Sequence, residues 1–347
     1  MDVYRTCGAN GYASAMCKNQ PNIACPPQTA TDQAGTAAPL SEMKATNEAV
    51  SNLTSDGNGR LWVALAAVLW STSGFFAKAP WFAGWPEETR GVQIAFWRGG
   101  IGCLVLLPFI RKPCFRWPMV PMVVCYAVMV WSFMTAMVLG PAANAIWLQY
   151  LCPAWILLVS VLVLRQRISR ADGWMFLYCL AGVALILVME LRQGTGLRAT
   201  GLGILSGVML AGVMLSIRAL RDVDAIWLTA LNQAGSAILL APIAHATHVP
   251  LAAGSYIALA FFGVVQMSIP YMIFARGLRT VSGPEASILM LIEPVLVPVW
   301  VFVAWQHHPG YVAPPWWTFA GGMLITFGLL SRYIPAMRSS LRRRVRG

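Results

Sequence analysis

The sequence predicts an all-α membrane protein in which ten transmembrane helices form two inverted five-helix repeats. Composition is the first reason: 58% of the 347 residues are hydrophobic and 11% are charged, whereas soluble domains carry about 25% charged residues. The second is ten apolar stretches between residues 61 and 333, each near the roughly 20 residues that cross the hydrocarbon core as a helix. The third is that the first five stretches resemble the second five at an offset of about 140 residues.

The predicted helices follow one another with short connections. They are residues 61–82, 92–110, 117–139, 142–164, 172–190, 201–219, 225–246, 253–277, 284–306 and 315–333. A membrane β-barrel would show alternating segments of roughly ten residues instead. We therefore expect one five-helix repeat over 61–190 and a second over 201–333. Because five is an odd number, the two copies must enter the bilayer in opposite orientations.

The ends of the chain are polar. Residues 1–60 have no apolar run, so we expect no cleaved signal peptide here, and their low hydrophobicity predicts a disordered cytoplasmic tail. Met43, close to the first helix, is an alternative starting methionine. Residues 334–347 form a basic cytoplasmic tail that we expect to meet anionic lipid head groups.

The repeat is visible in five matches that occur in the same order in both halves. The matched pairs are Lys78 with Arg218, Arg98 with Asn232, Gly140 with Gly283, Pro153 with Pro294, and Gly182 with Gly322. Each match alone is weak, but five in order are not easily accidental. An inverted repeat of this kind is the usual architecture of a secondary transporter, with the substrate site where the halves meet.

The basic residues predict the orientation. If the N-terminus is cytoplasmic, sixteen Lys and Arg residues fall in the inner loops and the C-terminal end, against four in the outer loops. The four outer residues are Lys78, Arg90, Arg192 and Arg198. Since cytoplasmic loops retain positive charge, we predict that both termini are cytoplasmic. The net charge of +12 is explained by this placement, and we expect no nucleic-acid partner.

Two charged residues lie well inside the predicted helices, Glu293 and Arg98. An intramembrane charge costs at least ~2.5–3.5 kcal/mol, so each is a candidate functional residue. Glu293 is either a site for a proton or a substrate amine, or a structural acid that satisfies backbone groups freed by Pro294. Arg98 is either a counter-ion for a substrate carboxylate, or a structural residue that reaches the outer interface.

Further candidates are the two prolines and a set of polar and aromatic residues. Pro153 and Pro294 lie at matching depths, where they either act as hinges or simply kink their helices. The other candidates for substrate binding or coupling are Trp70, Ser73, Trp147, Gln149, Asn232, Gln266 and Tyr271. Polar groups in a bilayer need partners, so they either line a cavity or join helices by hydrogen bonds.

Four short motifs stand in order along the chain: Trp70-Ser71, Ala95-Phe96-Trp97-Arg98, Pro153 and Ile292-Glu293-Pro294. With the ten-helix layout, they resemble the EamA-type branch of the drug/metabolite transporter (DMT) superfamily over residues 61–333. The resemblance implies a helical bundle with a central cavity, alternating access, export of small metabolites such as amino acids, and a bacterial inner membrane. Where family members often end the fourth or ninth helix with Gly-Glu, this chain has Arg165-Gln166 and Gln306-His307.

The sequence contains no catalytic or nucleotide-binding motif. There is no P-loop, which argues against a primary pump, and no HExxH or GxSxG. We therefore expect a transporter of a small molecule that is not an enzyme, with no cofactor and no metal, in contact with membrane lipid. The sequence leaves open whether the protein forms a homodimer. The alternative is a membrane protein without transport, either an intramembrane enzyme or a receptor or scaffold.

Overall fold

The computed structural model describes residues 59–163, 165, 169–193, 196–309 and 311–346, with side chains as far as Ile334. The predicted disordered tail lies outside these residues, except for its last two, Gly59 and Arg60, which already belong to the first helix. The described part is helical throughout and contains no strand.

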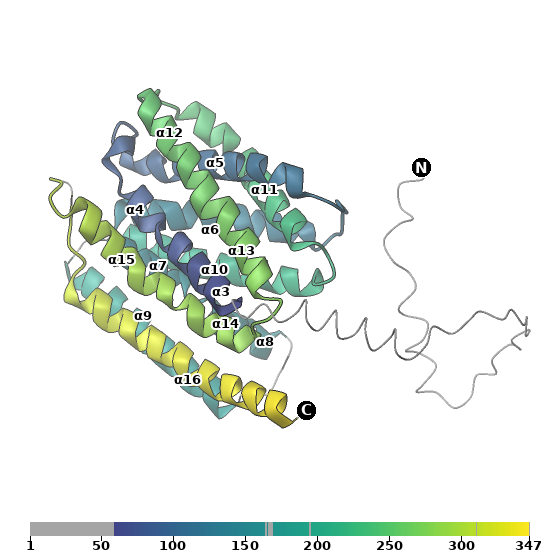
Figure 1. The fold of residues 1–347 in the computed structure, drawn as a ribbon. Coiled ribbons are helices and arrows are strands. Elements are labelled where there is room, and N and C mark those ends of the chain that lie inside the picture. The colour runs from purple at the N-terminus through teal and green to yellow at the C-terminus, as the bar shows by residue number, and fades with distance from the viewer. Residues whose placement is uncertain (1–58, 164, 166–168, 194–195, 310, 347) are drawn as a thin grey trace, which may run out of the picture. The chain divides into compact units, whose positions relative to one another are not determined.

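The helices follow the predicted segments closely (Figure 1). In chain order they are α3 (Gly59–Ser71), α4 (Ser73–Ala77), η1 (Pro80–Phe82), α5 (Glu87–Leu106), η2 (Leu107–Phe109), α6 (Met119–Leu139), α7 (Ala142–Gln149), α8 (Cys152–Leu162), α9 (Arg170–Gln193), α10 (Leu197–Ala219), α11 (Ala225–Ala246), α12 (Ala253–Phe262), the π-helix η3 (Gly263–Ser268), α13 (Ile269–Gly277), α14 (Gly283–Met290), α15 (Ile292–Trp305) and α16 (Trp316–Arg346).

Nine stretches in the described part of the chain are long and apolar enough to cross a membrane. Five of them combine shorter helices, such as Ala142–Leu162 from α7 and α8. The tenth predicted segment is the first part of α16, which continues as a helix through the basic end of the chain to Arg346. The all-α membrane fold predicted from the sequence is confirmed.

The fourth and ninth segments are broken at equivalent positions. Tyr150 and Leu151 separate α7 from α8, and Leu291 separates α14 from α15. Pro153 is the second residue of α8, and Pro294 is the third residue of α15. Proline has no N–H and its ring clashes with the preceding turn, so the regular helix stops before it. The sequence predicted kinks here, and the structure shows one short helix on each side of each break.

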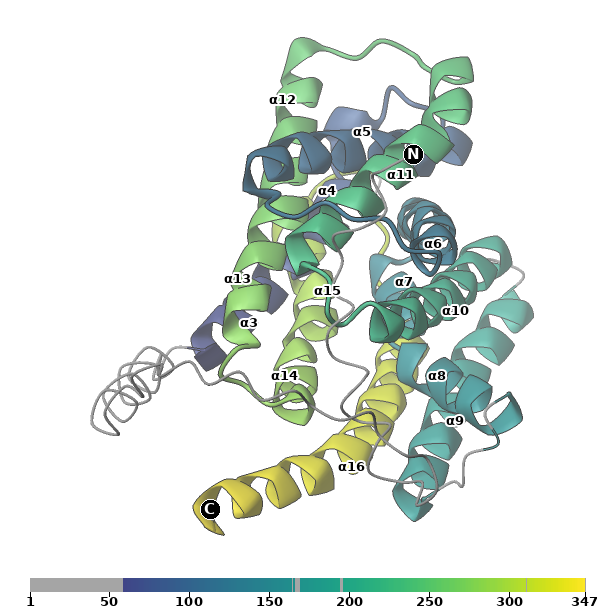
Figure 2. The ribbon, with the colours of Figure 1, turned by 90° about the vertical axis from the view of Figure 1, so that its right-hand side faces the viewer.

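The two halves interleave rather than lying apart. α6 packs against α10 and α5 packs against α11, so helices of the first half contact helices of the second. α9 and α16 also lie side by side in both views (Figures 1 and 2). They approach so closely at Gly182 that a Cβ atom there would lie 2.5 Å from the carbonyl oxygen of Gly321. Small residues permit this kind of contact between membrane helices.

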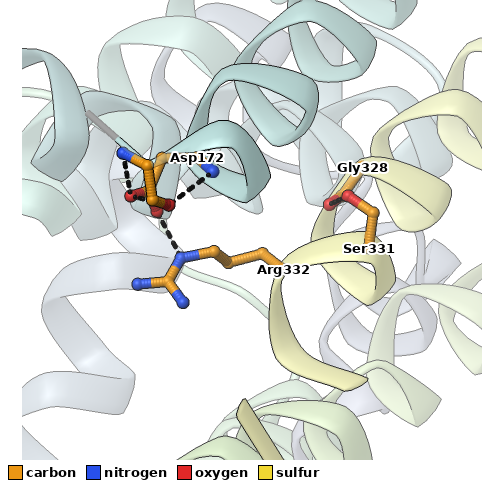
Figure 3. A network of polar contacts seen from close by, with 5 residues as sticks. Asp172, Gly328, Ser331 and Arg332 are labelled. Carbon is orange, nitrogen blue, oxygen red and sulfur yellow. Dashed lines mark hydrogen bonds and ion pairs between the residues drawn. The ribbon is translucent and has the colours of Figure 1, made fainter. Parts of the chain in front are cut away.

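A capping box fixes the start of α9. The backbone N–H of Ser169 donates to the carboxylate of Asp172 at 3.2 Å, and the backbone N–H of Asp172 donates to Ser169 Oγ at 3.1 Å. The same carboxylate forms an ion pair with Arg332 of α16, as Figure 3 shows. The start of the fifth segment is therefore tied to the end of the tenth.

Candidate substrate site

Arg98 lies on α5 and is almost completely buried, with 2% of its surface exposed. Its Nη1 donates a hydrogen bond to Gln266 Oε1 at 2.9 Å, and its guanidinium carbon lies 5.6 Å from the centroid of the Phe262 ring. Both partners are neutral. The ion pairs found among the described residues do not include Arg98.

Gln266 is presented to Arg98 by a local distortion of the eighth segment. It lies in η3, the six-residue π-helix between α12 and α13. π-Helical turns interrupt α-helices and often occur at functional sites. Both polar atoms of the Gln266 amide have a partner. Its Oε1 accepts from Arg98, and its Nε2 donates to the backbone oxygen of Trp70 at 3.4 Å. Gln266 therefore joins the second segment to the first.

Aromatic side chains surround this position. The ring of Trp70 lies edge-on to Tyr271 with the centroids 4.9 Å apart, and to Phe274 at 5.2 Å. Tyr126 and Tyr271 are electrostatic neighbours of the Arg98 guanidinium. The structure thus brings four predicted site residues together around one buried cation. They are Arg98, Gln266, Trp70 and Tyr271.

Glu293 lies in the first turn of α15, directly after the break in the ninth segment, and is 9% exposed. The hydroxyl oxygen of Tyr150 is 2.8 Å from Glu293 Oε2 and 2.7 Å from the backbone oxygen of Met290. Glu293 is also an electrostatic neighbour of Tyr271. Tyr271 therefore lies within electrostatic reach of both buried charges, Arg98 and Glu293.

The hydrogen bonds of Tyr150 depend on whether Glu293 carries a proton. A phenol has one hydrogen to donate, and here two oxygen acceptors lie within hydrogen-bond distance of it. A proton on Glu293 would satisfy both contacts at once, because the carboxylic acid would donate to Tyr150 while Tyr150 donates to Met290. The break in the ninth segment thus contains a group whose hydrogen bonding responds to protonation.

The remaining predicted residues lie elsewhere. Gln149 is buried and its Nε2 contacts Met129 Sδ at 3.3 Å. Ser73 Oγ and Asn232 Oδ1 are buried without a hydrogen-bond partner among the described residues. Trp147 packs against Gly322 and borders a groove between α15 and α16. A role in substrate binding for these four residues stays a prediction.

Sequence reasoning missed Tyr150 and a second buried carboxylate, Glu190. Glu190 is 4% exposed, and it accepts hydrogen bonds from Asn144 Nδ2 at 2.9 Å and from Trp317 Nε1 at 3.4 Å. Glu190 is the last residue of the predicted helix 172–190, and hydropathy alone suggests that a charged residue at a helix end is exposed. Tyr150 had one available signal, its position three residues before Pro153. Among the described residues, no group of three or more His, Cys, Asp or Glu side chains is arranged to hold a metal ion.

A bundle of membrane helices built as a repeat, with broken helices and buried charges in its interior, defines the class of membrane transporters. The model of the EamA-like transporter family matches residues 57–188 and 197–332, one match for each half. The chain belongs to the EamA-like transporter family and is an integral membrane transporter.

Curated relatives support the same class. The pseudopaline exporter CntI of Pseudomonas aeruginosa is 26% identical over 247 residues, which cover 69% of this chain and 84% of the relative. An uncharacterized transporter of Archaeoglobus fulgidus is 27% identical over 243 residues, which cover 68% of this chain and 84% of the relative. A solved crystal structure shares the fold with a TM-score of 0.55 at 20% identity, covering 82% of this chain and all of the other.

Proposed function

We propose that this protein is a secondary exporter of small amphipathic metabolites, such as amino acids, that works by alternating access. The observation that carries the proposal is the buried Arg98, whose partners are neutral side chains. A guanidinium is a planar fork of donors that matches a carboxylate. Arg98 has no ion pair among the described residues. In this proposal the carboxylate of the substrate supplies the negative charge that pairs with it.

Glu293 has one of two roles in this proposal. It binds a positively charged group of the substrate, or it carries the proton whose movement drives export. The contacts of Tyr150 support the second role, since a proton on Glu293 completes the hydrogen bonds at the break between α14 and α15. Protonation would then favour one arrangement of the ninth segment, which is the kind of two-state element that alternating access requires.

One relative, the pseudopaline exporter, is named for export, and the match to it covers 69% of this chain. We extend only the direction of transport from it, and the substrate class rests on Arg98. We also propose the bacterial inner membrane as the location, with both termini in the cytoplasm, because of the distribution of basic residues in the loops.

A thermal-shift screen tests this proposal. The purified protein in detergent is heated with amino acids, nucleobases, polyamines and decarboxylated analogues, because a ligand that binds the native state raises the melting temperature. We expect stabilisation by a compound with a free carboxylate and none by its decarboxylated analogue. Arg98→Ala should abolish the shift, whereas Arg116→Ala, which removes a cation on the surface, should keep it.

A second pair of variants separates the two roles of Glu293. Glu293→Gln should abolish ligand binding if the carboxylate holds an amine, and should preserve binding if the carboxylate carries the coupling proton. Glu190→Gln is the matched control, since Glu190 is equally buried and bonded to neutral side chains. Stabilisation by carboxylates and by their decarboxylated analogues alike would contradict the role of Arg98.

A further inference from the structure

An apolar groove runs along the outside of the bundle between α15 and α16. Its volume is ≈ 630 Å³, within the range of about 300–1,000 Å³ that is typical of ligand sites. The wall on α15 is formed by Val295, Pro298, Val299 and Phe302, and the wall on α16 includes Phe319, Met323 and Phe327. Trp147 closes the groove toward the interior of the bundle.

The groove exists because the ninth segment is broken. Its first half, α14, packs against α16. After the break at Leu291, α15 leaves α16, although both helices turn an apolar stripe toward the space between them. The lining residues of α15 have the spacing i, i+3, i+4, i+7, so they lie on one face of that helix. Val299 on this face and Met323 on α16 are 45% and 66% exposed.

The length of the groove matches one leaflet of a bilayer. Along α16 the groove reaches from Phe319 to Leu330, which is roughly 16 Å at 1.5 Å per residue. The hydrocarbon core of a bilayer is about 30 Å thick, so the groove covers about half of it. It starts near the N-terminal end of α16, which the predicted topology places at the outer membrane surface.

A cationic pocket adjoins the groove at that surface. Pro298, Tyr311 and Pro314 line both spaces, and Lys78 and His308 line only the pocket. Lys78 is half-buried, and its Nζ donates one hydrogen bond, to the backbone oxygen of Val138 at 2.9 Å. An ammonium group has three donors, so donors remain for an anion. Trp305 holds the wall of the pocket in place, since its Nε1 donates to the backbone oxygen of Phe75 at 2.9 Å.

We propose that the groove holds one acyl chain of an anionic phospholipid whose phosphate binds Lys78 in the adjoining pocket. The apolar walls fit the chain, the length fits one leaflet, and the charge of the pocket fits the phosphate. The site is separate from the buried Arg98 and Glu293, and it does not depend on the proposed export function. A lipid bound there would occupy the space into which α15 and α16 must move if they close.

Lipid binding to the purified protein tests this proposal. The protein in detergent is titrated with dioleoylphosphatidylglycerol and, separately, with dioleoylphosphatidylcholine, which has the same chains and no net charge. Native mass spectrometry counts the retained lipid. We expect the wild type to bind the anionic lipid about fivefold more tightly or better, the effect of one basic side chain near a membrane surface.

Three variants and one control identify the contacts. Lys78→Gln should bring the two lipids to equal affinity, and Lys78→Arg should keep the preference. Val299→Trp, which fills the groove, should reduce the retention of both lipids, whereas Leu104→Trp at an exposed position on α5 should not. Equal retention of both lipids by the wild type, or a preference that survives Lys78→Gln, would overturn the proposal. So would unchanged retention in Val299→Trp.

Discussion

A polar group buried inside a bilayer is stabilised by a compensating contact, because bulk water does not reach it there. Arg98 and Glu293 meet this requirement with neutral partners, namely Gln266 and Tyr150. Glu285, in the first turn of α14, instead forms an ion pair with Arg60. Arg98 and Glu293 have no ion pair among the described residues, and we propose that they interact with a substrate or a proton.

The two intramembrane charges were predictable from the sequence, because hydropathy places them inside helices. Their partners were not. Gln266 and Arg98 are 168 residues apart along the chain, and a repeat offset relates equivalent positions rather than contacting ones. Tyr150 was missed for the same reason, since nothing local to it indicates that it faces Glu293 across 143 residues of sequence.

The Tyr150 hydroxyl gives a prediction at the residue scale. Tyr150→Phe removes the hydroxyl group that contacts the backbone oxygen of Met290 and the carboxyl group of Glu293, and leaving buried polar groups unsatisfied costs about 1–3 kcal/mol. We expect a lower melting temperature in detergent. Tyr178→Phe is the control, because the ring of Tyr178 packs edge-on against Phe327 with the centroids 4.9 Å apart. Equal melting temperatures for the two variants would show that the Tyr150 contacts contribute nothing to stability.

Lys78 gives a second prediction, based on its ionisation. Lys78 follows the last residue of the first membrane stretch, and burial lowers its pKa from 10.5 to about 8 despite the opposing effect of Glu87. Arg90, His308 and Tyr311 are its other ionisable neighbours. Its amine should therefore be half deprotonated near pH 8.

Acylation of Lys78 with an amine-reactive reagent, followed by mass spectrometry, measures this directly. In lipid-free detergent the extent of labelling should rise with a midpoint near pH 8. The sign follows from the charge: a lowered folded-state pKa means that the folded protein gains stability as the pH rises from about 8 toward 10.5. A labelling midpoint near 10.5 would contradict the burial of this amine.

At the scale of elements, the broken helices are the features for which we predict a hinge role. Both breaks lie next to a proline, and both were anticipated in position from the matching offsets of Pro153 and Pro294. The π-helix at Gly263–Ser268 was not anticipated. An extra residue in a helical turn leaves no periodic signal in a stretch of six residues.

A proline exchange tests whether the break in the ninth segment acts as a hinge. Pro294→Ala restores a backbone N–H and permits a more continuous helix. We expect substrate binding to persist while the rate of transport falls. Pro298→Ala is the matched control, since Pro298 lies within the unbroken α15. Equal transport rates in the two variants would argue that the break is static.

At the scale of the whole molecule, the sequence predicts the number and order of the segments but not how the halves meet. The first nine predicted segments agree with the observed membrane stretches within about five residues at each end, whereas the tenth helix continues to Arg346. The packing of α6 on α10 and of α5 on α11 follows from side-chain shape and cannot be read from periodicity. The division into repeats at residues 61–190 and 201–333 stays a prediction, as does the orientation of the termini.

Orientation can be measured by cysteine labelling. In a chain whose eight native cysteines have been replaced, Ala313→Cys should react with a membrane-impermeant maleimide added to intact cells. Lys112→Cys should react only after the cells are opened. The reason is the excess of basic residues in the loops assigned to the cytoplasm. The reverse pattern would invert the assignment of inner and outer faces.

Counterflow in proteoliposomes is the most direct test of the central claim, that this protein moves a small carboxylate-bearing molecule across the membrane through a site at Arg98. Vesicles loaded with an unlabelled ligand found in the thermal-shift screen are diluted into the same ligand carrying a radiolabel. We predict that the wild type accumulates label. Arg98→Ala should slow this uptake by about tenfold or more, the effect of losing a hydrogen bond to a charged group worth about 1.5–3 kcal/mol. Binding of the ligand without any accumulation of label would contradict the account and favour a receptor.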